Sequence, residues 1–347
     1  MANRLKENRG SVKLLRVGLL WTVLAGLLVV LSIIAVNIGS VKFSVPEIYT
    51  SIFCDETALT EEQGLTRTIV LNLRLPRVVL AILVGACLSA AGALLQAVMR
   101  NPLADPGSIG VSAGAGTAAI TVLLIFPNMT TALPMFAFVG AAFACVLIYL
   151  LAWKDGVNPV RIILAGVAIN SVLGAYNSLL QLMNSDNLAG VLAFMNGSLS
   201  GMSWTHVGTI LSYSIVGLIM ALLCVRHANA LQLGDEMAKN LGIRVNGARI
   251  ALSAVSAFLA AATVSVVGMI SFVGLVVPHI ARMLVGSDYK VMMPTSILLG
   301  SVTLLVADTI GRTIVPGMEI PVGIVMSVCG GPFFLYMLRK RGKFNGS

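Results

Sequence analysis

The sequence predicts an all-α protein, a polytopic transmembrane helix bundle of about ten spans. Apolar residues make up 57% of the 347 residues and charged residues only 11%, whereas a soluble domain carries roughly a quarter charged residues. So much apolar surface exceeds what one water-soluble core encloses. Apolar runs of about 20 residues, long enough to cross a bilayer as a helix, also recur along the chain. We therefore expect a single transmembrane domain over residues 1–347.

The first five expected spans are marked by apolar runs with small residues. The first contains VGLLWTVLAGLLVVLSIIAV, which holds no charged residue. The second carries Gly85, Gly92 and Gln96, residues that a simple lipid anchor rarely needs. VSAGAGTAA in the third and LAGVAIN in the fifth offer small faces for close helix contact. We place these spans near residues 17–38, 76–98, 108–126, 132–153 and 161–182.

The last five expected spans include the least regular one. Pro278, His279 and Arg282 interrupt the eighth, and Pro278 is expected to kink or break that helix. Asp308 and Arg312 lie four residues apart at the end of the ninth, where an ion pair would neutralise both. We place these spans near residues 205–225, 247–268, 271–286, 292–310 and 320–338.

The distribution of basic residues predicts the orientation of the bundle. An even number of spans puts both termini on one side, and eighteen of the 23 Lys and Arg residues flank the spans on that side, against five on the other. Because basic residues concentrate in cytoplasmic loops, residues 1–16 and 339–347 are predicted to be cytoplasmic tails. The scattered basic residues also account for the net charge of +9 at a lipid surface, without a nucleic-acid partner.

Several classes of function lack their sequence marks. No lysine is followed by Ser or Thr, so the chain has no phosphate-binding loop for ATP. The five cysteines show no CxxC spacing and the three histidines no HExxH spacing. We therefore expect no catalytic residue, no metal site and no cofactor in this chain. The basic and then apolar amino terminus is expected to be a retained span, because its apolar run is too long for a signal peptide.

The most informative loop is NALQLGDEMAKNLGIRVN, residues 229–246, between the sixth and seventh spans. Gly234 and Gly242 bracket a helical stretch that has Asp235 in its first turn. Met237 and Leu241 lie four residues apart, on one face of that helix. A helix of about two turns is unstable alone in water, so it packs either on its own bundle or in a groove of a partner.

Polar residues inside the spans are candidates for a translocation path, because hydrocarbon penalises them. Gln96 lies in the second span. Asn170, Asn177 and Gln181 lie in the fifth at spacings of seven and four, which places them on one stripe. These side chains either line a path or make hydrogen bonds between helices, and the sequence leaves both interpretations open.

Three segments in order carry a family resemblance. They are RLPRVVLAILVGACLSAAGALLQAVMRNPLADPG, VGMISFVGLVVPHIARMLVGSDYKVMMP and ADTIGRTIVPGMEIPVGIVMSVCGGPFFLYML. Together they closely resemble the permease subunits of ABC importers of the FecCD/BtuC type, which carry ferric siderophores, haem or cobalamin across the bacterial inner membrane. The resemblance spans roughly residues 70–340. It implies the type II ABC importer permease fold and a place in the bacterial cytoplasmic membrane.

The resemblance also implies partners and site residues. Such permeases work as dimers with two ATP-binding subunits, where ATP is hydrolysed, and with an extracytoplasmic substrate-binding protein. Arginines at the positions of Arg74, Arg77 and Arg312 receive acidic residues of the binding protein; the alternative is that they snorkel to lipid headgroups. The LG–x6–LG segment is the coupling helix that contacts the ATPase, here Leu233, Gly234, Asp235, Met237, Ala238, Leu241 and Gly242.

The expected function is therefore that of a permease subunit in an ATP-driven importer. It would move an iron–siderophore, haem-like or cobalamin-like complex by alternating access, with ferric siderophore first on family frequency alone. The alternative is an ion-gradient-driven secondary transporter, which is expected to bury a charged residue deep in a span, and only Asp308 comes close. In KDGVNPVRIILAG, Pro159 and Val160 stand where some family members have hydroxyl residues, so no gate residue is assigned.

Overall fold

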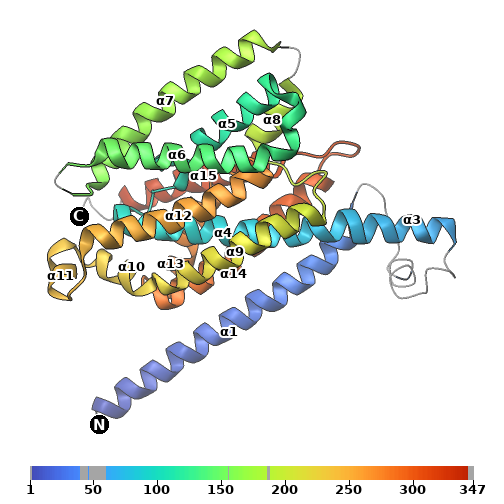
Figure 1. Cartoon of the computed structure of the whole chain (residues 1–347). Helices are drawn as coiled ribbons and strands as arrows, with labels where there is room; N and C mark the ends of the chain where they lie inside the picture. The colour runs from blue at the N-terminus through green and yellow to red at the C-terminus, as the bar shows by residue number, and fades with distance from the viewer. Residues whose placement is uncertain (1, 40–45, 47–59, 155, 186–187, 343–347) are drawn as a thin grey trace.

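The computed structural model describes residues 2–39, 46, 60–154, 156–185 and 188–342, and all regular structure in these ranges is helical. One helix stands at each of the ten expected spans (Figure 1). Seven are long and apolar enough to cross a membrane, whereas α5, α13 and the apolar part of α15 are shorter. The ten are α1 (Ala2–Asn37), α4 (Leu75–Met99), α5 (Val111–Ile125), α6 (Leu133–Ala152), α7 (Pro159–Met183), α9 (Trp204–Leu223), α12 (Val245–Val267), α13 (Val273–Val285), α14 (Tyr289–Thr313) and α15 (Val322–Gly342).

Short helices connect these spans at the two ends of the bundle. They are α3 (Glu61–Ile69), η2 (Val70–Arg74), η3 (Pro106–Ile109), η4 (Pro127–Ala132), α8 (Leu188–Asn196), α10 (Val225–Gln232) and α11 (Asp235–Asn240). We call the end that carries α11 the α11 end, and the opposite end, near α3, the arginine end. Helix α1 begins and α15 ends at the α11 end, which confirms that both lie on one side (Figure 1).

The second span is longer than the sequence predicts. Helices α3, η2 and α4 follow one another without a break, and Gln63–Met99 forms a single 37-residue span. Thr60 starts this helix through a capping box with Gln63. Residues 61–73, expected in an external loop, are therefore helical. The apolar run alone could not reveal this, because the cap and the π-helical turn at Val70–Arg74 extend the helix through polar residues.

Helix α13 begins two residues after the expected start of the eighth span, and it continues through Pro278. Pro278 lies inside the helix, which runs on to Val285, so the expected break is not at that residue. The interruption lies before it, where Gly268 (φ 76°) and Phe272 (φ 69°) adopt left-handed backbone conformations. With 13 residues, α13 is only about 20 Å long and cannot cross a bilayer alone.

Helix α4 forms the core of the bundle. It packs against α9, α12, α13 and α14, and 83% of its apolar 18-residue stretch is buried inside the protein. Its glycines permit this packing: a Cβ at Gly85 would collide with the backbone of Gly300, and a Cβ at Gly92 with the backbone of Gly274. By contrast, only 11% of the corresponding apolar stretch is buried in each of α1 and α7.

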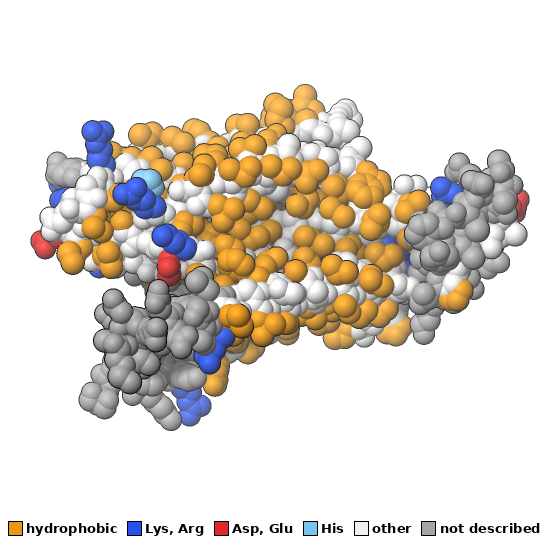
Figure 2. Space-filling view, turned by 90° about the horizontal axis from the view of Figure 1, so that it is seen from below, with side chains coloured by type: hydrophobic (Ala, Val, Ile, Leu, Met, Phe, Trp, Pro, Cys, Tyr) orange, Lys and Arg blue, Asp and Glu red, His pale blue; other side chains and the backbone are white. Residues whose placement is uncertain are grey.

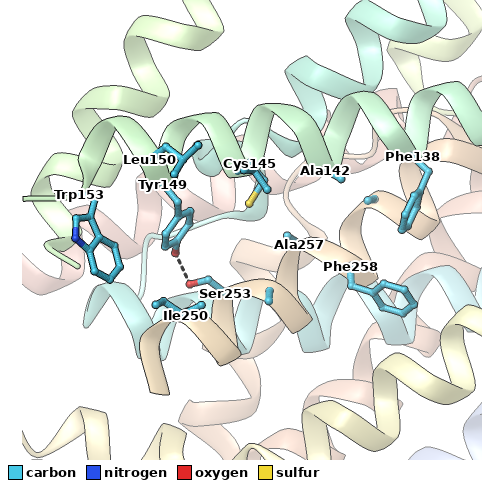
Figure 3. A pocket seen from close by; sticks show the side chains of 13 residues that line it. Phe138, Ala142, Cys145, Tyr149, Leu150, Trp153, Ile250, Ser253, Ala257 and Phe258 are labelled. Carbon is cyan, nitrogen blue, oxygen red and sulfur yellow. Dashed lines mark hydrogen bonds between the residues drawn. The ribbon is translucent and has the colours of Figure 1, made fainter. Parts of the chain in front are cut away.

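Helices α6 and α12 face each other across an apolar groove (Figure 3). Phe138 and Phe258 meet edge to face at one end, with ring centroids 5.9 Å apart, and Trp153 stands at the other. The hydroxyl groups of Tyr149 and Ser253 hydrogen-bond to each other across the groove. The space encloses about 420 Å³, and its walls are almost wholly apolar.

The surface separates apolar and basic side chains along the bundle. In Figure 2, hydrophobic side chains cover much of the visible body, while Lys and Arg gather toward the α11 end. Because a bilayer excludes charge from its centre, this separation is the one expected of a protein that crosses a membrane.

Candidate functional site: a charged network and an exposed helix

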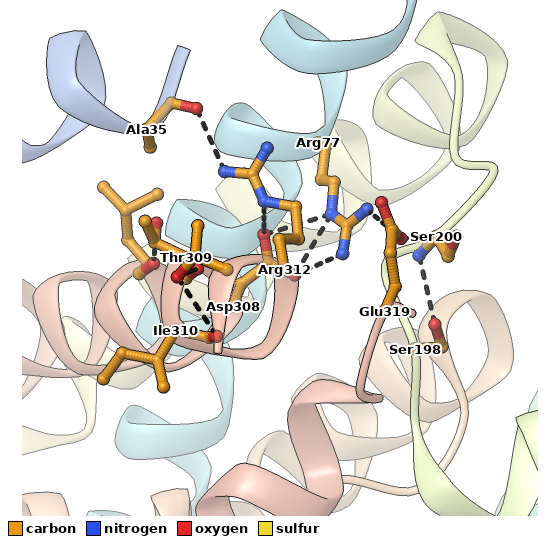
Figure 4. Close-up of polar contacts among 11 residues, drawn as sticks. Ala35, Arg77, Ser198, Ser200, Asp308, Thr309, Ile310, Arg312 and Glu319 are labelled. Atoms are coloured by element: carbon orange, nitrogen blue, oxygen red, sulfur yellow. Dashed lines mark hydrogen bonds and ion pairs between the residues drawn. The ribbon is translucent and has the colours of Figure 1, made fainter. Parts of the chain in front are cut away.

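A network of charged side chains joins three helices at the arginine end. Arg77, in the first turn of α4, donates from Nε and Nη2 to Asp308 of α14 at 3.0–3.1 Å (Figure 4). Its Nη1 donates to Glu319 at 2.7 Å. Asp308 is almost fully enclosed, with 1% of its side chain exposed. The Arg77 guanidinium therefore bridges a buried carboxylate and one in the α14–α15 loop.

Arg312 adds a second cation to Asp308. Its Nε lies 3.3 Å from Asp308 Oδ2, one helical turn away, and its Nη2 donates to the Ala35 carbonyl at 3.0 Å. The predicted ion pair between Asp308 and Arg312 is thus confirmed. Because Ala35 belongs to the last turn of α1, the network also fastens α1 to α14.

Arg74 completes the arginine set from the end of η2. It donates to the carbonyls of Val36 and Asn37 at 2.8 and 3.0 Å, so it caps the carboxyl end of α1. Arg74, Arg77 and Arg312 are 6–8% exposed. These side chains pack between helices and do not extend along the surface as snorkelling arginines do. The ion pair with Asp308 competes with docking by Arg312, and the docking role of the three arginines stays a prediction.

Glu319 is the most accessible acidic member of the network. About 35% of its side chain is exposed, and Ser200 donates to the same carboxylate at 2.9 Å. Burial alone would raise the pKa of Glu319, but the hydrogen bond and charge of Arg77 outweigh it and hold the pKa below its ordinary value. A cavity of about 110 Å³ opens beside this carboxylate, lined by Gly39, Ile69, Leu73, Arg74, Arg77, Arg312 and Glu319.

The helix expected between Gly234 and Gly242 is present as α11. Gly234 (φ 101°) and Gly242 (φ 77°) have backbone conformations that favour glycine, and they turn the chain into and out of the helix. Ala238 is fully buried against the bundle. Asp235 accepts a hydrogen bond from Arg249 of α12 at 2.9 Å, and Arg249 also donates to the Val157 carbonyl at 2.7 Å. Helix α11 is therefore fixed to its own bundle on one side only.

The rest of α11 is uncovered within the described chain, and large apolar side chains are exposed there. Leu233, Met237 and Leu241 are 59%, 57% and 58% exposed. Met237 and Leu241 lie four residues apart and so share one face of α11, and Leu233 precedes the helix at Gly234. Of the two interpretations that the sequence left open, packing on its own bundle accounts for Ala238 but not for these three side chains.

The four expected path residues lie in two different environments. Gln96 is 3% exposed; its Nε2 donates to the carbonyls of Gly274 and Leu275, and its Oε1 accepts from Arg282 at 3.0 Å. It therefore joins α4 to α13. On α7, Asn170 donates to the Gly107 carbonyl at 3.4 Å.

The remaining two share α7 with Asn170. Gln181 donates to the Asn177 carbonyl at 3.1 Å. The Oδ1 atoms of Asn170 and Asn177 are buried, and they have no hydrogen-bond partner among the described residues. The three polar residues predicted to share one face of this span all lie on α7, and the Oδ1 atoms of two of them accept no hydrogen bond from the described residues.

Sequence reasoning missed Glu319, Arg249 and Arg282 as members of these sites. A signal for Glu319 did exist, since Asp308 and Glu319 are the only acidic residues after Asp288. Arg249 and Arg282 looked like ordinary basic residues at span ends. Their partners are Asp235, 14 residues away, and Gln96, 186 residues away, and only the fold brings the latter pair together.

Comparisons with known proteins agree with this architecture. The model of the FecCD transport family matches residues 27–340. The chain is 39% identical over 321 residues to the Fe(3+)-citrate import system permease protein YfmE of Bacillus subtilis (strain 168), which covers 91% of this chain and 93% of that protein. It is 37% identical to the hemin transport system permease protein HmuU of Yersinia pestis, over 92% and 95% of the two chains.

A solved structure is similar in fold over nearly its whole length. It is described as an inward-facing conformation of a metal-chelate type ABC transporter, with a TM-score of 0.82 and 27% identity, and the match covers 92% of this chain and 98% of that one. The family model, relatives above 30% identity and the helical bundle all indicate the same group. The chain belongs to the FecCD transport family of ABC transporter permeases.

Proposed function

We propose that this chain is the membrane-spanning subunit of an ATP-driven importer that moves a metal chelate of the iron–siderophore, haem or cobalamin class by alternating access. The observation that carries the proposal is the exposure of three large apolar side chains, Leu233, Met237 and Leu241, on and beside a helix braced by Arg249. Three large apolar side chains at the charged end of a membrane bundle favour a protein partner over water. The ATP-binding subunit is that partner, and ATP is hydrolysed there.

The bracing of α11 supports a role in transmitting motion. Arg249 ties α11 and the α6–α7 turn to α12, so displacement of α11 by the ATPase would move a long span and that turn together. A short element held at both ends is suited to passing domain closure into a bundle. Two ATP-binding subunits, one on each permease subunit of a homo- or heterodimer, would act on two such helices.

The arginine end supports docking of a substrate-binding protein. Asp308 is buried between Arg77 and Arg312, but Glu319 is part-exposed and sits in a loop. A carboxylate of the binding protein could enter the 110 Å³ cavity and replace Glu319 on Arg77 while Asp308 keeps its position. Such an exchange conserves the number of ion pairs, so it would set orientation and encounter rate more than affinity.

The translocation path is proposed to run beside α7, between this chain and a second permease subunit, in a homo- or heterodimer. Helix α7 is mostly exposed and carries Asn170, Asn177 and Gln181 on one stripe; the Oδ1 atoms of Asn170 and Asn177 are buried acceptors that a rotation of α7 would bring to a passing polar ligand. Gln96 would not line the path; it would support it from the core by holding α13 to α4. The α11 end is proposed to face the bacterial cytoplasm, because the basic residues concentrate there.

The test is co-purification from membranes of the native host, with mass spectrometry of the recovered proteins. The wild-type chain should bring down an ATP-binding subunit, and Met237→Asp with Leu241→Asp should lose it, because the charges would be desolvated at the interface. Glu236→Gln, on another face of α11, is the matched control and should retain it. Recovery of the ATPase with the double variant at wild-type yield would overturn the coupling role.

The class of ligand needs a separate experiment. Uptake of ⁵⁵Fe-labelled chelates into cells that carry the intact system should depend on this chain and on ATP. The ion-gradient alternative predicts uptake without any ATPase partner. Asp308, the acidic residue buried in a span within the described residues, already contacts two guanidinium groups, which argues against its use as an ion-coupling site.

A further inference from the structure

The apolar groove between α6 and α12 leads directly to a basic pocket. The groove is lined from Phe138 to Trp153, on α6 and at its C-cap, and from Ile250 to Ala261 on α12. The pocket begins at Lys154, which follows Trp153, and at Arg249, which precedes Ile250. It encloses about 570 Å³. The two spaces therefore form one amphipathic site, apolar along the bundle and polar at the α11 end.

The pocket carries a strong excess of positive charge. Its walls include five basic side chains and a single carboxylate, Asp235; Asp155 lies outside the described residues. Arg249 engages that carboxylate at 2.9 Å, so none remains in the walls for the other four cations. These four are Lys154, Arg161, Lys239 and Arg244. An anionic group placed here would meet basic side chains from both the α6–α7 and the α11–α12 connections.

The groove has the dimensions and chemistry of a site for an acyl chain. From Phe138 to Trp153 the α6 wall rises about 22 Å, more than the roughly 15 Å of one leaflet's hydrocarbon. The Tyr149 and Ser253 hydroxyl groups hydrogen-bond to each other, so the groove needs no polar group from its occupant. Phe138 and Phe258 close the far end, as Figure 3 shows.

Trp153 marks the level at which the two parts meet. It is 52% exposed, lines the groove and directly precedes Lys154 of the pocket. Tryptophan favours the membrane interface, where its ring is apolar and its N–H is hydrated. A lipid whose phosphate lay just beyond Trp153 would sit at headgroup depth, with its chain in the groove.

We propose that the groove and the basic pocket together bind one anionic phospholipid, with an acyl chain along α6 and α12 and the phosphate among Lys154, Arg161 and Arg244. Charge complementarity selects the anionic headgroup, and the apolar groove selects a lipid over a free anion. Basic pockets between spans are suited to this use. Because Arg249 links the pocket wall to α11, the lipid would also stiffen the mounting of that helix.

The test is native mass spectrometry of the purified full chain, exchanged into detergent with phosphatidylglycerol or phosphatidylcholine. We expect one phosphatidylglycerol retained per chain and a clear preference over phosphatidylcholine. Lys154→Gln with Arg161→Gln and Arg244→Gln should reduce that preference roughly 100-fold, since each basic residue near an anionic lipid contributes about 1 kcal/mol. Arg226→Gln with Lys290→Gln, two basic residues outside the groove and pocket, should leave it unchanged.

A second variant tests the groove. Ala254 is exposed within it, so Ala254→Phe would fill the space without overpacking the core, and it should lower retention of both lipids. Ala25→Phe on the exposed side of α1 is the matched control. Equal retention of both lipids by the wild type, or unchanged retention in both test variants, would overturn the proposal.

Two further results would replace the lipid by another occupant. Inorganic phosphate that raises the thermal midpoint as much as phosphatidylglycerol, in wild type and in Ala254→Phe alike, would identify a free-anion site. If the triple variant loses the ATP-binding subunit but keeps phosphatidylglycerol, the pocket is a protein interface. Either result contradicts lipid binding.

Discussion

At the scale of single residues, the two carboxylates of the arginine end differ in what they hold. Asp308 is 1% exposed and lies between two guanidinium groups from α4 and α14, whereas Glu319 is 35% exposed and contacts Arg77 from a loop. Removing the carboxylate charge at position 308 takes the close carboxylate from the buried Arg312 and leaves Arg77 with Glu319 alone. When the carboxylate at position 319 is neutralised, water can solvate the exposed side of the Arg77 guanidinium.

We therefore predict that Asp308→Asn lowers the thermal midpoint far more than Glu319→Gln. Breaking a buried pair by removing one partner costs about 3–5 kcal/mol, whereas an exposed pair contributes about 1 kcal/mol or less. Thermal unfolding of the purified variants in one detergent measures the difference. Similar midpoints for the two variants would show that Asp308 is not the centre of the network.

The lowered pKa of Glu319 predicts a dependence on pH. Because the folded pKa lies below the ordinary value of 4.5, the Glu319 contribution is fully present above about pH 4.5 and is lost as the pH falls through the folded pKa. The difference in midpoint between wild type and Glu319→Gln should therefore be constant from pH 7 to about pH 5 and shrink below. A difference that grew on acidification would contradict the sign.

Residues also show where sequence reasoning reached its limit. The Asp308–Arg312 pair was predictable, because a spacing of four fixes the geometry on a helix. Arg77–Asp308 joins residues 231 positions apart, and Arg282–Gln96 joins residues 186 apart. No local pattern encodes such pairs, so the network and the bracing of Gln96 emerged only from the fold.

At the scale of elements, the ten apolar runs predicted ten helices, but their ends depended on local chemistry. Hydropathy located α4 and missed α3, since Thr60 and Gln63 start that helix outside the apolar run. It placed the eighth span correctly, but the helix does not break at Pro278, and the break before it at the left-handed Phe272 has no sequence mark. Helix α11 was predictable from its two glycines, although the exposure of its apolar side chains was not.

The close approach of α4 to its neighbours gives a prediction for matched glycines. Gly92→Ala should lower the thermal midpoint strongly, because its Cβ would collide with the Gly274 backbone, which cannot rotate away as a side chain does. Gly18→Ala on α1 meets nothing within 4 Å and should be neutral or stabilising by about 0.5–1 kcal/mol. Equal effects at both positions would contradict the packing of α4 on α13.

At the scale of the whole molecule, the separation of basic and apolar surface predicts a fixed orientation. Single cysteines introduced at Ser287, beside the α11 end, and at Ser200, near the arginine end, should react differently with a membrane-impermeant maleimide in a background without the native cysteines. Ser200→Cys should label in intact cells, and Ser287→Cys only after the membrane is opened. The reverse pattern would invert the proposed orientation, and with it the assignment of both docking ends.

The burial of α4 has a consequence for how the protein is made. Most of the helices that enclose α4 lie further along the chain, and its contact at Gly300 is about 200 residues beyond Met99. At roughly 5–20 residues per second, translation of that interval takes about 10–40 s. During this time α4 waits in lipid with its glycine face unoccupied. Insertion and assembly are therefore separate stages for this chain, and a nascent protein arrested before α14 would expose the surface on which the finished bundle closes.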